Sequence, residues 1–213
     1  MAKATTKPKG ATSYKETAFG IIPQSQLITL ELEGTKKGLE YISTLIKAGK
    51  NAPITPDLIC KLHAISFSWI FPKWAGKYRN IQVTFSGKEA PPYYRIPELM
   101  VILCKNLKER LRHLPKADDE EKFIIKVVEL LAWFQHRFVF IHPFQDYNGR
   151  TARMLTTFTL LQLNLPPIEL KAETKKDRKQ YLTAMQKADE EDFVFLEKLI
   201  NNALIESLEL IKN

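Results

Sequence analysis

Helical periodicity is the feature that most constrains how this 213-residue chain can fold. After residue 23, apolar side chains recur every three to four positions in nearly every segment, which is the spacing of one face of an α-helix. Proline and capping residues divide these segments, since Thr55-Pro56-Asp57 has the pattern of a helix start and Pro97 opens another helix. Further helices are predicted from the acidic run at 118–121 to about residue 137, and over 148–163, 177–189 and 193–212.

One stretch departs from the helical pattern. Residues 73–92 are rich in side chains that favour strands, and they contain the turn signal Ser86-Gly87. The sequence therefore predicts a mainly α, single-domain helical bundle with one short β-hairpin. Residues 1–20, which hold Lys, Thr, Pro and Gly without an apolar run, are predicted to be a flexible basic tail ahead of a domain over 21–213.

Charge and cysteine content narrow the functional classes. The formal net charge of +8 favours anionic partners such as nucleotides or nucleic acid, although scattered lysines also serve solubility. Cys60 and Cys104 lie in apolar stretches without a metal-binding or disulfide spacing, so we expect two reduced thiols in a cytoplasmic protein. The N-terminus has no secretory-signal pattern, and the longest apolar stretches, such as 65–71, are too short to span a bilayer.

Chemically active side chains crowd into the segment FVFIHPFQDYNGRTAR, residues 138–153, between two apolar helices. A turn between helices needs a glycine or proline and a cap, and it does not need His, Asp and two Arg. Asn148 and Gly149 begin the next helix, whose first N–H groups lack helical partners and carry partial positive charge. Arg150 and Arg153 can both reach this helix start, so the segment predicts a polyphosphate site.

Two further side chains complete the predicted site. Asp146 offers an oxygen ligand of the kind that Mg²⁺ (or Mn²⁺) takes when phosphates fill the rest of its shell. His142 can accept a proton near neutral pH and is the candidate general base. Phe144 is predicted to anchor the loop to the core. Each residue alone would be an ordinary loop or cap residue, and their coincidence in one loop favours a catalytic site.

This loop resembles the motif of the Fic family, H-x-F-x-[D/E]-G-N-[G/K]-R followed by x-x-R. The residues in register are His142, Phe144, Asp146, Asn148, Gly149, Arg150 and Arg153. Tyr147 stands where the family usually has Gly, which costs more in a positive-φ conformation and adds bulk beside the anion. The similarity extends over residues 25–210 and implies a Fic-type fold in which the predicted hairpin is a flap.

The resemblance implies a protein adenylyltransferase. ATP, with Mg²⁺ or Mn²⁺, would lie over the helix start, and AMP would pass to a Ser, Thr or Tyr hydroxyl of a target protein while His142 takes the proton. The hairpin would bind the backbone of the target along a strand edge. The candidate docking residues are Gln82, Val83, Thr84 and Phe85. Homo-oligomerisation is left open.

A short motif ahead of the core implies self-inhibition. The segment TLELEG at 29–34 fits the pattern [S/T]-x-x-x-E-[G/N] of Fic inhibitory helices, here predicted over about 24–34. Glu33 would pair with Arg153 and keep ATP from binding productively, and Thr29 lies on the same helix face. On this basis, Glu33→Gly is expected to raise self-modification with ATP.

Three alternatives stay open at this level. A Fic-type fold could use another nucleotide-derived donor, although Gly149 in place of Lys favours nucleotidyl transfer. A non-catalytic basic nucleic-acid-binding protein would suit the charge, but the sequence contains no recognition helix. A metal hydrolase built on His113, His136 and His142 is disfavoured, because their spacing matches no metal-binding pattern.

Overall fold

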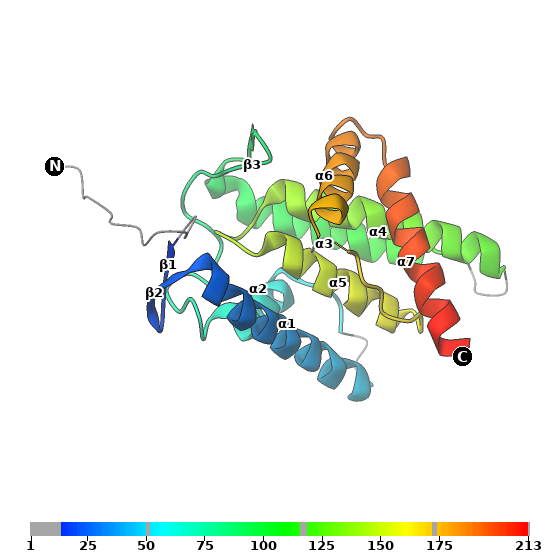
Figure 1. Cartoon of the computed structure of the whole chain (residues 1–213). Helices are drawn as coiled ribbons and strands as arrows, with labels where there is room; N and C mark the ends of the chain where they lie inside the picture. The colour runs from blue at the N-terminus through cyan, green and yellow to red at the C-terminus, as the bar shows by residue number, and fades with distance from the viewer. Residues whose placement is uncertain (1–13, 50–51, 116–118, 172–173, 213) are drawn as a thin grey trace.

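The computed structural model describes residues 14–49, 52–115, 119–171 and 174–212. These residues form seven α-helices and two small hairpins (Figure 1). The helices are α1 (Gln24–Lys47), α2 (Pro56–Phe67), α3 (Ile96–Arg112), α4 (Glu120–Ile141), α5 (Asn148–Gln162), α6 (Lys175–Asp189) and α7 (Val194–Lys212). The antiparallel hairpins are β1 (Tyr14–Thr17) with β2 (Gly20–Pro23), and β3 (Thr84–Phe85) with β4 (Lys88–Glu89). The mainly α prediction is confirmed, with one hairpin more than expected.

Local capping explains where the helices begin. The Thr55 side chain accepts a hydrogen bond from the Leu58 N–H at 3.2 Å, and Pro56 occupies the first turn of α2. Asp119 caps α4 in the same way, accepting from the Lys122 N–H at 3.2 Å. Capping depends on neighbouring residues only, which is why these starts could be predicted from sequence.

The first helix contradicts the prediction that Gly34 ends a short helix. Helix α1 continues to Lys47, and its glycines serve close packing instead. A Cβ on Gly34 would lie 2.4 Å from the Ser66 carbonyl oxygen, and one on Gly38 would lie 2.3 Å from Ser66 Oγ and 2.5 Å from Met154 Sδ. Gly34 and Gly38 therefore let α1 approach α2 and α5 closely, at the cost in helix propensity that glycine carries.

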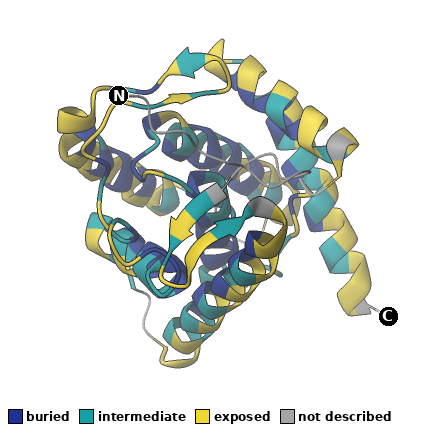
Figure 2. Ribbon diagram, turned by 60° about the vertical axis from the view of Figure 1, so that its left-hand side comes forward, coloured by how far each residue is buried: buried dark blue, intermediate teal, exposed yellow. Residues whose placement is uncertain are grey.

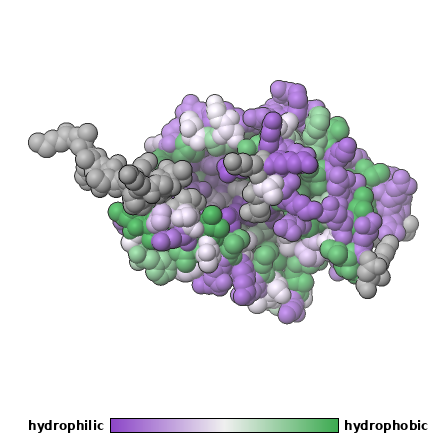
Figure 3. All heavy atoms as spheres, viewed as in Figure 1, coloured by the Kyte–Doolittle hydropathy of each residue, from purple (hydrophilic) through white to green (hydrophobic). Residues whose placement is uncertain are grey.

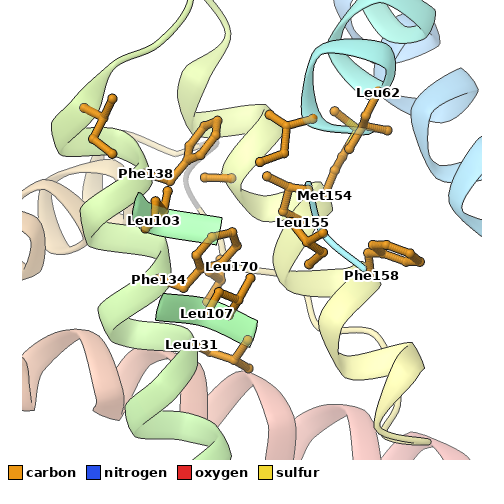
Figure 4. Packing of buried hydrophobic residues seen from close by; sticks show 14 of the residues in the cluster. Leu62, Leu103, Leu107, Leu131, Phe134, Phe138, Met154, Leu155, Phe158 and Leu170 are labelled. Carbon is orange, nitrogen blue, oxygen red and sulfur yellow. The ribbon is translucent and has the colours of Figure 1, made fainter. Parts of the chain in front are cut away.

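Helices α4 and α5 form the centre of the bundle. Helix α4 packs against α3, α5, α6 and α7, while α5 packs against α1, α2 and α4. Figure 4 shows the apolar side chains between them, and the residues coloured as buried in Figure 2 gather on the inner sides of the central helices. The fully buried members include Leu131, Phe134, Phe138, Leu155 and Phe158. The loop of residues 142–147 joins these two central helices, so the core itself positions the candidate site.

The predicted tail over residues 1–20 is wrong in its last part. Residues 1–13 lie outside the described residues, but 14–20 belong to the β1–β2 hairpin. The Ala18 N–H donates to the Ile70 carbonyl at 2.8 Å, which docks the hairpin after α2. Hydrophobic residues gather at the left of the face in Figure 3, over this hairpin and the first turns of α1. Tertiary contact therefore decides this element, because its sequence has no strong strand pattern.

The predicted flap is the β3–β4 hairpin. Its turn residues Ser86 and Gly87 have φ values of 48° and 80°, as expected for the turn that suits a two-residue hairpin. The Ala90 N–H donates to the Val83 carbonyl at 3.0 Å, and the Gln82 side chain donates to the Ala90 carbonyl at 2.5 Å. Across the described residues, no helix has both the length and the apolar character needed to cross a membrane.

Candidate functional site

His142 follows the last residue of α4 with a left-handed backbone (φ 50°), which turns its side chain out of the helix direction. Its Nδ1 lies 3.1 Å from the Val139 carbonyl oxygen. Because a carbonyl can only accept, Nδ1 donates this bond and Nε2 keeps its lone pair. The ring of Phe85 on the flap stacks on the imidazole, with centroids 4.3 Å apart and planes 13° apart. The Val139 carbonyl thus sets the tautomer that leaves the lone pair on Nε2, and Phe85 of the flap packs against the ring.

The pKa of His142 is lowered from its ordinary value, chiefly by burial of the imidazole. The hydrogen bond to the Val139 carbonyl opposes this effect, and the nearby Arg79 charge adds to it. A lowered pKa keeps the imidazole neutral near pH 7, which is the protonation state that can take a proton from a substrate.

Arg79 is a buried residue whose guanidinium bonds several backbone carbonyls, and it was not identified from the sequence. Its Nε donates to the His142 carbonyl at 2.8 Å. Its Nη1 donates to Ile81 at 2.8 Å and its Nη2 to Pro91 at 2.6 Å, both carbonyls at the two ends of the flap. The side chain is only 4% exposed. One guanidinium therefore ties the flap to the loop that carries the imidazole, and an Arg inside a strand-favouring stretch was the signal that could have found it.

The start of α5 provides the expected backbone donors. The Thr151 N–H donates to the Tyr147 carbonyl at 2.9 Å, which is the first helical hydrogen bond of α5. The N–H groups of residues 148–150 precede this bond, so they have no acceptor within the helix. Asn148 was predicted to bind phosphate, but its side chain is committed elsewhere. Its Oδ1 accepts from the Phe144 N–H and its Nδ2 donates to the Phe144 carbonyl, both at 2.9 Å. The Asn148 side chain thus closes the loop, and only its backbone N–H is left for the predicted phosphate binding.

The two arginines of the motif come together at the first turns of α5. Arg150 and Arg153 both line a cavity of about 340 Å³. The Arg153 Nη1 lies 3.7 Å from where a Cβ on Gly149 would stand, so this guanidinium reaches back to the helix start. The predicted grouping of Gly149 with both guanidinium groups is therefore present in the folded chain.

Tyr147 adopts the positive φ (61°) that made glycine the expected residue here. Its side chain does not add bulk beside the helix start as predicted, because it points into the core and is 6% exposed. The ring stacks on Phe67 at 4.4 Å and on Trp74 at 6.0 Å. Burial and the neighbouring Glu31 raise the pKa of the phenol. Aromatic packing, typically worth about 0.5–1.5 kcal/mol per pair, helps offset the strain of this backbone.

Glu31, and not Glu33, is the α1 carboxylate that enters the site. Its two oxygens accept from the Tyr147 hydroxyl at 2.7 Å and from Arg150 Nη2 at 2.9 Å. Glu31 is 4% exposed, whereas Thr29 and Glu33 are exposed to solvent. The predicted Glu33–Arg153 pair is therefore corrected to a pair between Glu31 and Arg150.

The physical reason lies in the helix face that α1 buries. Leu27, Glu31, Gly34, Gly38 and Ile42 are all buried and follow each other at spacings of three or four. Close packing on α2 through the two glycines selects this face, and Glu33 lies about 200° around the helix from Glu31. This spacing was the signal in the sequence that could have identified Glu31.

Asp146 lies in the loop where a metal ligand was predicted, but its carboxylate is already engaged. Oδ1 accepts from the Tyr147 N–H at 2.7 Å, and Oδ2 forms an ion pair with the Lys15 ammonium on β1. The described residues contain no group of three or more His, Cys, Asp or Glu that could hold a metal ion. In the part of the chain that the structure describes, Asp146 would be the carboxylate that holds a divalent ion, with Lys15 already paired to it, and nucleotide phosphates would have to complete the shell of the ion.

His63 supports the loop from α2, and sequence reasoning missed it. Its Nδ1 accepts from the Gly76 N–H at 2.8 Å, so its Nε2 carries the proton and donates to the Asp146 carbonyl at 3.1 Å. The imidazole also stacks on the anchor Phe144, with centroids 3.8 Å apart. Burial lowers the pKa of His63 to about 4, and burial likewise lowers that of His136 to about 4.

The lowered pKa values of His63 and His136 predict that the folded protein loses stability in acid. Because their pKa is lower in the folded chain than in the unfolded one, the unfolded chain takes up protons first as the pH falls below about 6.5. Stability is fully present above that pH and is lost toward pH 4.5, by roughly 2–3 kcal/mol for each histidine. Urea unfolding at pH 7.0, 6.0, 5.0 and 4.5 measures the loss. His63→Gln should flatten this pH dependence, and the exposed His113→Gln should not; equal slopes in all three proteins would contradict the assignment.

Comparison with known proteins identifies the family of this site. Residues 53–160 match the model of the Fic/DOC family, a stretch that includes the flap and the whole loop. A protein adenylyltransferase Fic of Nematostella vectensis is 33% identical over 180 residues, which cover 84% of this chain and 39% of that relative. One from Aedes aegypti is 29% identical over 162 residues, covering 76% of this chain and 30% of that relative. The chain thus spans less than half the length of these relatives.

Solved structures share the fold. A Fic-domain-containing signalling protein from Bacteroides thetaiotaomicron superposes with a TM-score of 0.69 at 25% identity, covering 84% of this chain and 69% of that one. BepC of Bartonella tribocorum, solved with bound AMPPNP, superposes with a TM-score of 0.66 at 20% identity, covering 92% and 94%. With the loop geometry, the family match over half of the sequence and these relatives, the chain belongs to the Fic/DOC family.

Proposed function

We propose that this chain is a protein adenylyltransferase, which transfers AMP from ATP to a Ser, Thr or Tyr hydroxyl of a target protein. The observation on which this rests most is His142, whose Nδ1–H is held by Val139 so that Nε2 can accept a proton. It lies on the same short loop as the N–H groups and guanidinium groups at the start of α5. The curated relatives are named protein adenylyltransferases, and BepC binds an ATP analogue.

The proposed reaction divides the work among these groups. The N–H groups at the start of α5, with Arg150 and Arg153, bind the phosphates of ATP and stabilise the charge that develops on them. The target hydroxyl oxygen attacks the α-phosphorus while its proton passes to His142 Nε2. The bond from the α-phosphorus to the bridging α–β oxygen breaks, and pyrophosphate leaves. Positioning and charge stabilisation supply most of the rate, as in other phosphoryl-transfer reactions.

The flap is proposed to bind the target. Strand β3 pairs with β4 along one edge only, so its other edge can accept an extended peptide through main-chain hydrogen bonds. Thr84 is exposed, and the Phe85 ring packs on His142. A peptide paired with β3 would therefore lie beside the imidazole, with its hydroxyl near the ring. Gln82 and Val83 hold the hairpin through Ala90 and are assigned a supporting part.

We also propose that Glu31 inhibits the enzyme. Its carboxylate neutralises Arg150 and places a negative charge beside the phosphate-binding turn. A triphosphate would have to displace this carboxylate before Arg150 could bind it. A divalent ion, Mg²⁺ or Mn²⁺, would meet a similar obstacle at Asp146, where Lys15 is already bound.

The donor is tested directly. Incubating the purified chain with labelled ATP, CTP, GTP and UTP, in the presence of Mg²⁺ or Mn²⁺, and measuring the intact mass of the protein reports self-modification. An AMP-sized gain with ATP supports adenylyl transfer, while a gain with another nucleotide assigns another nucleotide-derived donor. No gain from any nucleotide, also after removal of the Glu31 carboxylate, would count against the proposed function.

Arg79 is expected to position the imidazole and the flap without touching the nucleotide. Arg79→Lys keeps the positive charge but cannot bridge three carbonyls with fixed geometry. We expect kcat to fall about tenfold or more, with a stability loss of about 2–3 kcal/mol from the buried carbonyls left unpaired. Steady-state kinetics with a peptide acceptor and calorimetric ATP binding separate the two steps. Arg95→Lys, at an exposed pair with Glu98, is the matched control; a rise in the ATP Kd with unchanged kcat would contradict the positioning role.

A further inference from the structure

The β1–β2 hairpin is attached next to the site by three different contacts. The Ala18 N–H bonds the Ile70 carbonyl, the Phe19 ring packs edge-on against Trp69 with centroids 5.9 Å apart, and Lys73 pairs with Glu16 at 2.6 Å. These contacts involve backbone, aromatic and charged groups, and none of them involves Lys15. The position of β1 is therefore set independently of the Lys15 side chain.

This attachment places the Lys15 ammonium against the loop of residues 142–147. It forms an ion pair with Asp146 and lies 5.0 Å from the Tyr147 ring centroid and 5.9 Å from that of Phe71. The two partners are separated by 131 residues in sequence, so only the tertiary fold brings them together. A cation near two aromatic faces and one carboxylate is held at a defined place without being removed from water.

Lys15 and Asp146 both remain accessible to a solute. Their side chains are 31% and 44% exposed, and both line a cavity of about 550 Å³ that also includes Gln145 of the loop. An ion pair with this exposure contributes little to stability, typically about 0–1 kcal/mol. The hairpin does not need it, since three other contacts attach β1. Because the Lys15–Asp146 pair adds little to stability, the place of Lys15 beside the loop carboxylate is better explained by ligand binding than by a role in folding.

The charge of the site points to the ligand. Glu31 neutralises Arg150, and Asp146 is a second carboxylate in the loop, whose charge Lys15 neutralises. A triphosphate entering here needs positive charge that the loop itself supplies only in part. The compact ammonium of a lysine binds phosphate oxygens as a point charge and can turn from one anion to another on its flexible stem.

We propose that Lys15 is a substrate-contacting residue, whose ammonium moves from Asp146 to the phosphates of the incoming nucleotide. There it supplies part of the positive charge that a divalent ion would otherwise provide. The chain consequently binds a nucleoside triphosphate with a weakened dependence on divalent metal. This inference rests on the proposed function, because it assumes that the loop binds a nucleotide.

Calorimetric binding of an ATP analogue with an uncleavable α–β bridge tests the proposal on the full chain. Binding is measured with Mg²⁺ and again in EDTA, for the wild type, Lys15→Gln, Lys15→Arg and the control Lys73→Gln. Lys73 lines the same cavity and belongs to the same hairpin contact, but its partner is Glu16 and not Asp146. Thermal unfolding of each variant verifies that the hairpin and the fold persist.

The expected result is a wild type that binds the analogue in EDTA with a Kd within about tenfold of that in Mg²⁺. Lys15→Gln should raise the Kd in EDTA by about tenfold to a hundredfold, the loss of one charge-assisted hydrogen bond. Lys15→Arg should restore most of the affinity, and Lys73→Gln should change it little.

Two results would overturn the proposal. An unchanged Kd for Lys15→Gln in EDTA would mean that the ammonium does not contact phosphate. Tighter binding by Lys15→Gln in Mg²⁺ would mean that Lys15 only blocks Asp146. In both cases the nucleotide still binds, so the proposed function stands, whereas a wild type and a Glu31→Ala variant that bind no analogue in either buffer would refute the proposed function itself.

Discussion

Replacing His142 by alanine is expected to lower the rate of AMP transfer by a factor of about 10²–10⁴, the usual contribution of a positioned general base. The variant should still bind ATP, because the groups at the start of α5 that we propose bind the phosphates do not depend on the imidazole. Quench-flow or gel-based assays with labelled ATP measure the rate, and calorimetry measures binding.

The pH profile of the wild type gives a second signature. Transfer requires the neutral imidazole, and burial lowers the pKa of His142. The rate should therefore rise with pH, and its half-maximum should lie below about 6.5, the pKa of a free imidazole. His142→Ala should lose this acid limb.

His113→Ala is the matched control for this prediction. His113 is exposed after α3 and its Nδ1 lies 2.8 Å from the carbonyl of Glu109 in its own helix. Its removal should leave rate and pH profile unchanged. Equal rates for His142→Ala and the wild type would exclude His142 as the base and leave the loop as a binding site only.

Removing the Glu31 carboxylate is expected to raise self-modification and lower stability in the same variant. Glu31→Ala frees Arg150 for phosphate, and we expect an increase in AMP incorporation of about tenfold, equivalent to ~1.4 kcal/mol. The Tyr147 hydroxyl loses its buried acceptor, so unfolding free energy should fall by about 1–3 kcal/mol. The opposite signs separate release of Arg150 from a general loss of structure, which would lower both activity and stability.

Glu33→Ala is the control because it makes the same change two residues along α1. Glu33 is exposed, and alanine costs nothing in helix propensity, so neither activity nor stability should change by more than the variation common at surface sites. Activation by Glu33→Ala and not by Glu31→Ala would restore the pairing inferred from the sequence motif. Intact-mass measurement after incubation with ATP compares the two variants directly.

Much of the fold could be predicted because the signals are local. The apolar spacing and caps such as Thr55 and Asp119 depend on residues within one or two turns, so the starts of α2 and α4 could be predicted to within two residues. The flap followed from its strand-favouring residues and the Ser86-Gly87 turn. The β1–β2 hairpin could not be predicted, since it depends on docking against residues 68–74.

The loop shows the same division at the level of single residues. Its grouping of His142, Arg150 and Arg153 could be predicted because all three lie within twelve positions of one motif. The role of Asn148 differed, because its side chain satisfies the Phe144 backbone that the turn leaves exposed. The space for Tyr147 came from Phe67 and Trp74, which lie far away in the chain.

By itself, the sequence determined the helical architecture, the composition of the loop over residues 142–147 and the family to which the chain belongs. Only the tertiary structure decided which charged side chains contact that loop: Glu31 from α1, Lys15 from β1 and Arg79 at the base of the flap. A motif specifies which groups lie next to one another along the chain, whereas the rotation of α1 about its axis and the docking of β1 depend on close packing against distant residues. For α1, that rotation is set by Gly34 and Gly38, where no side chain could fit.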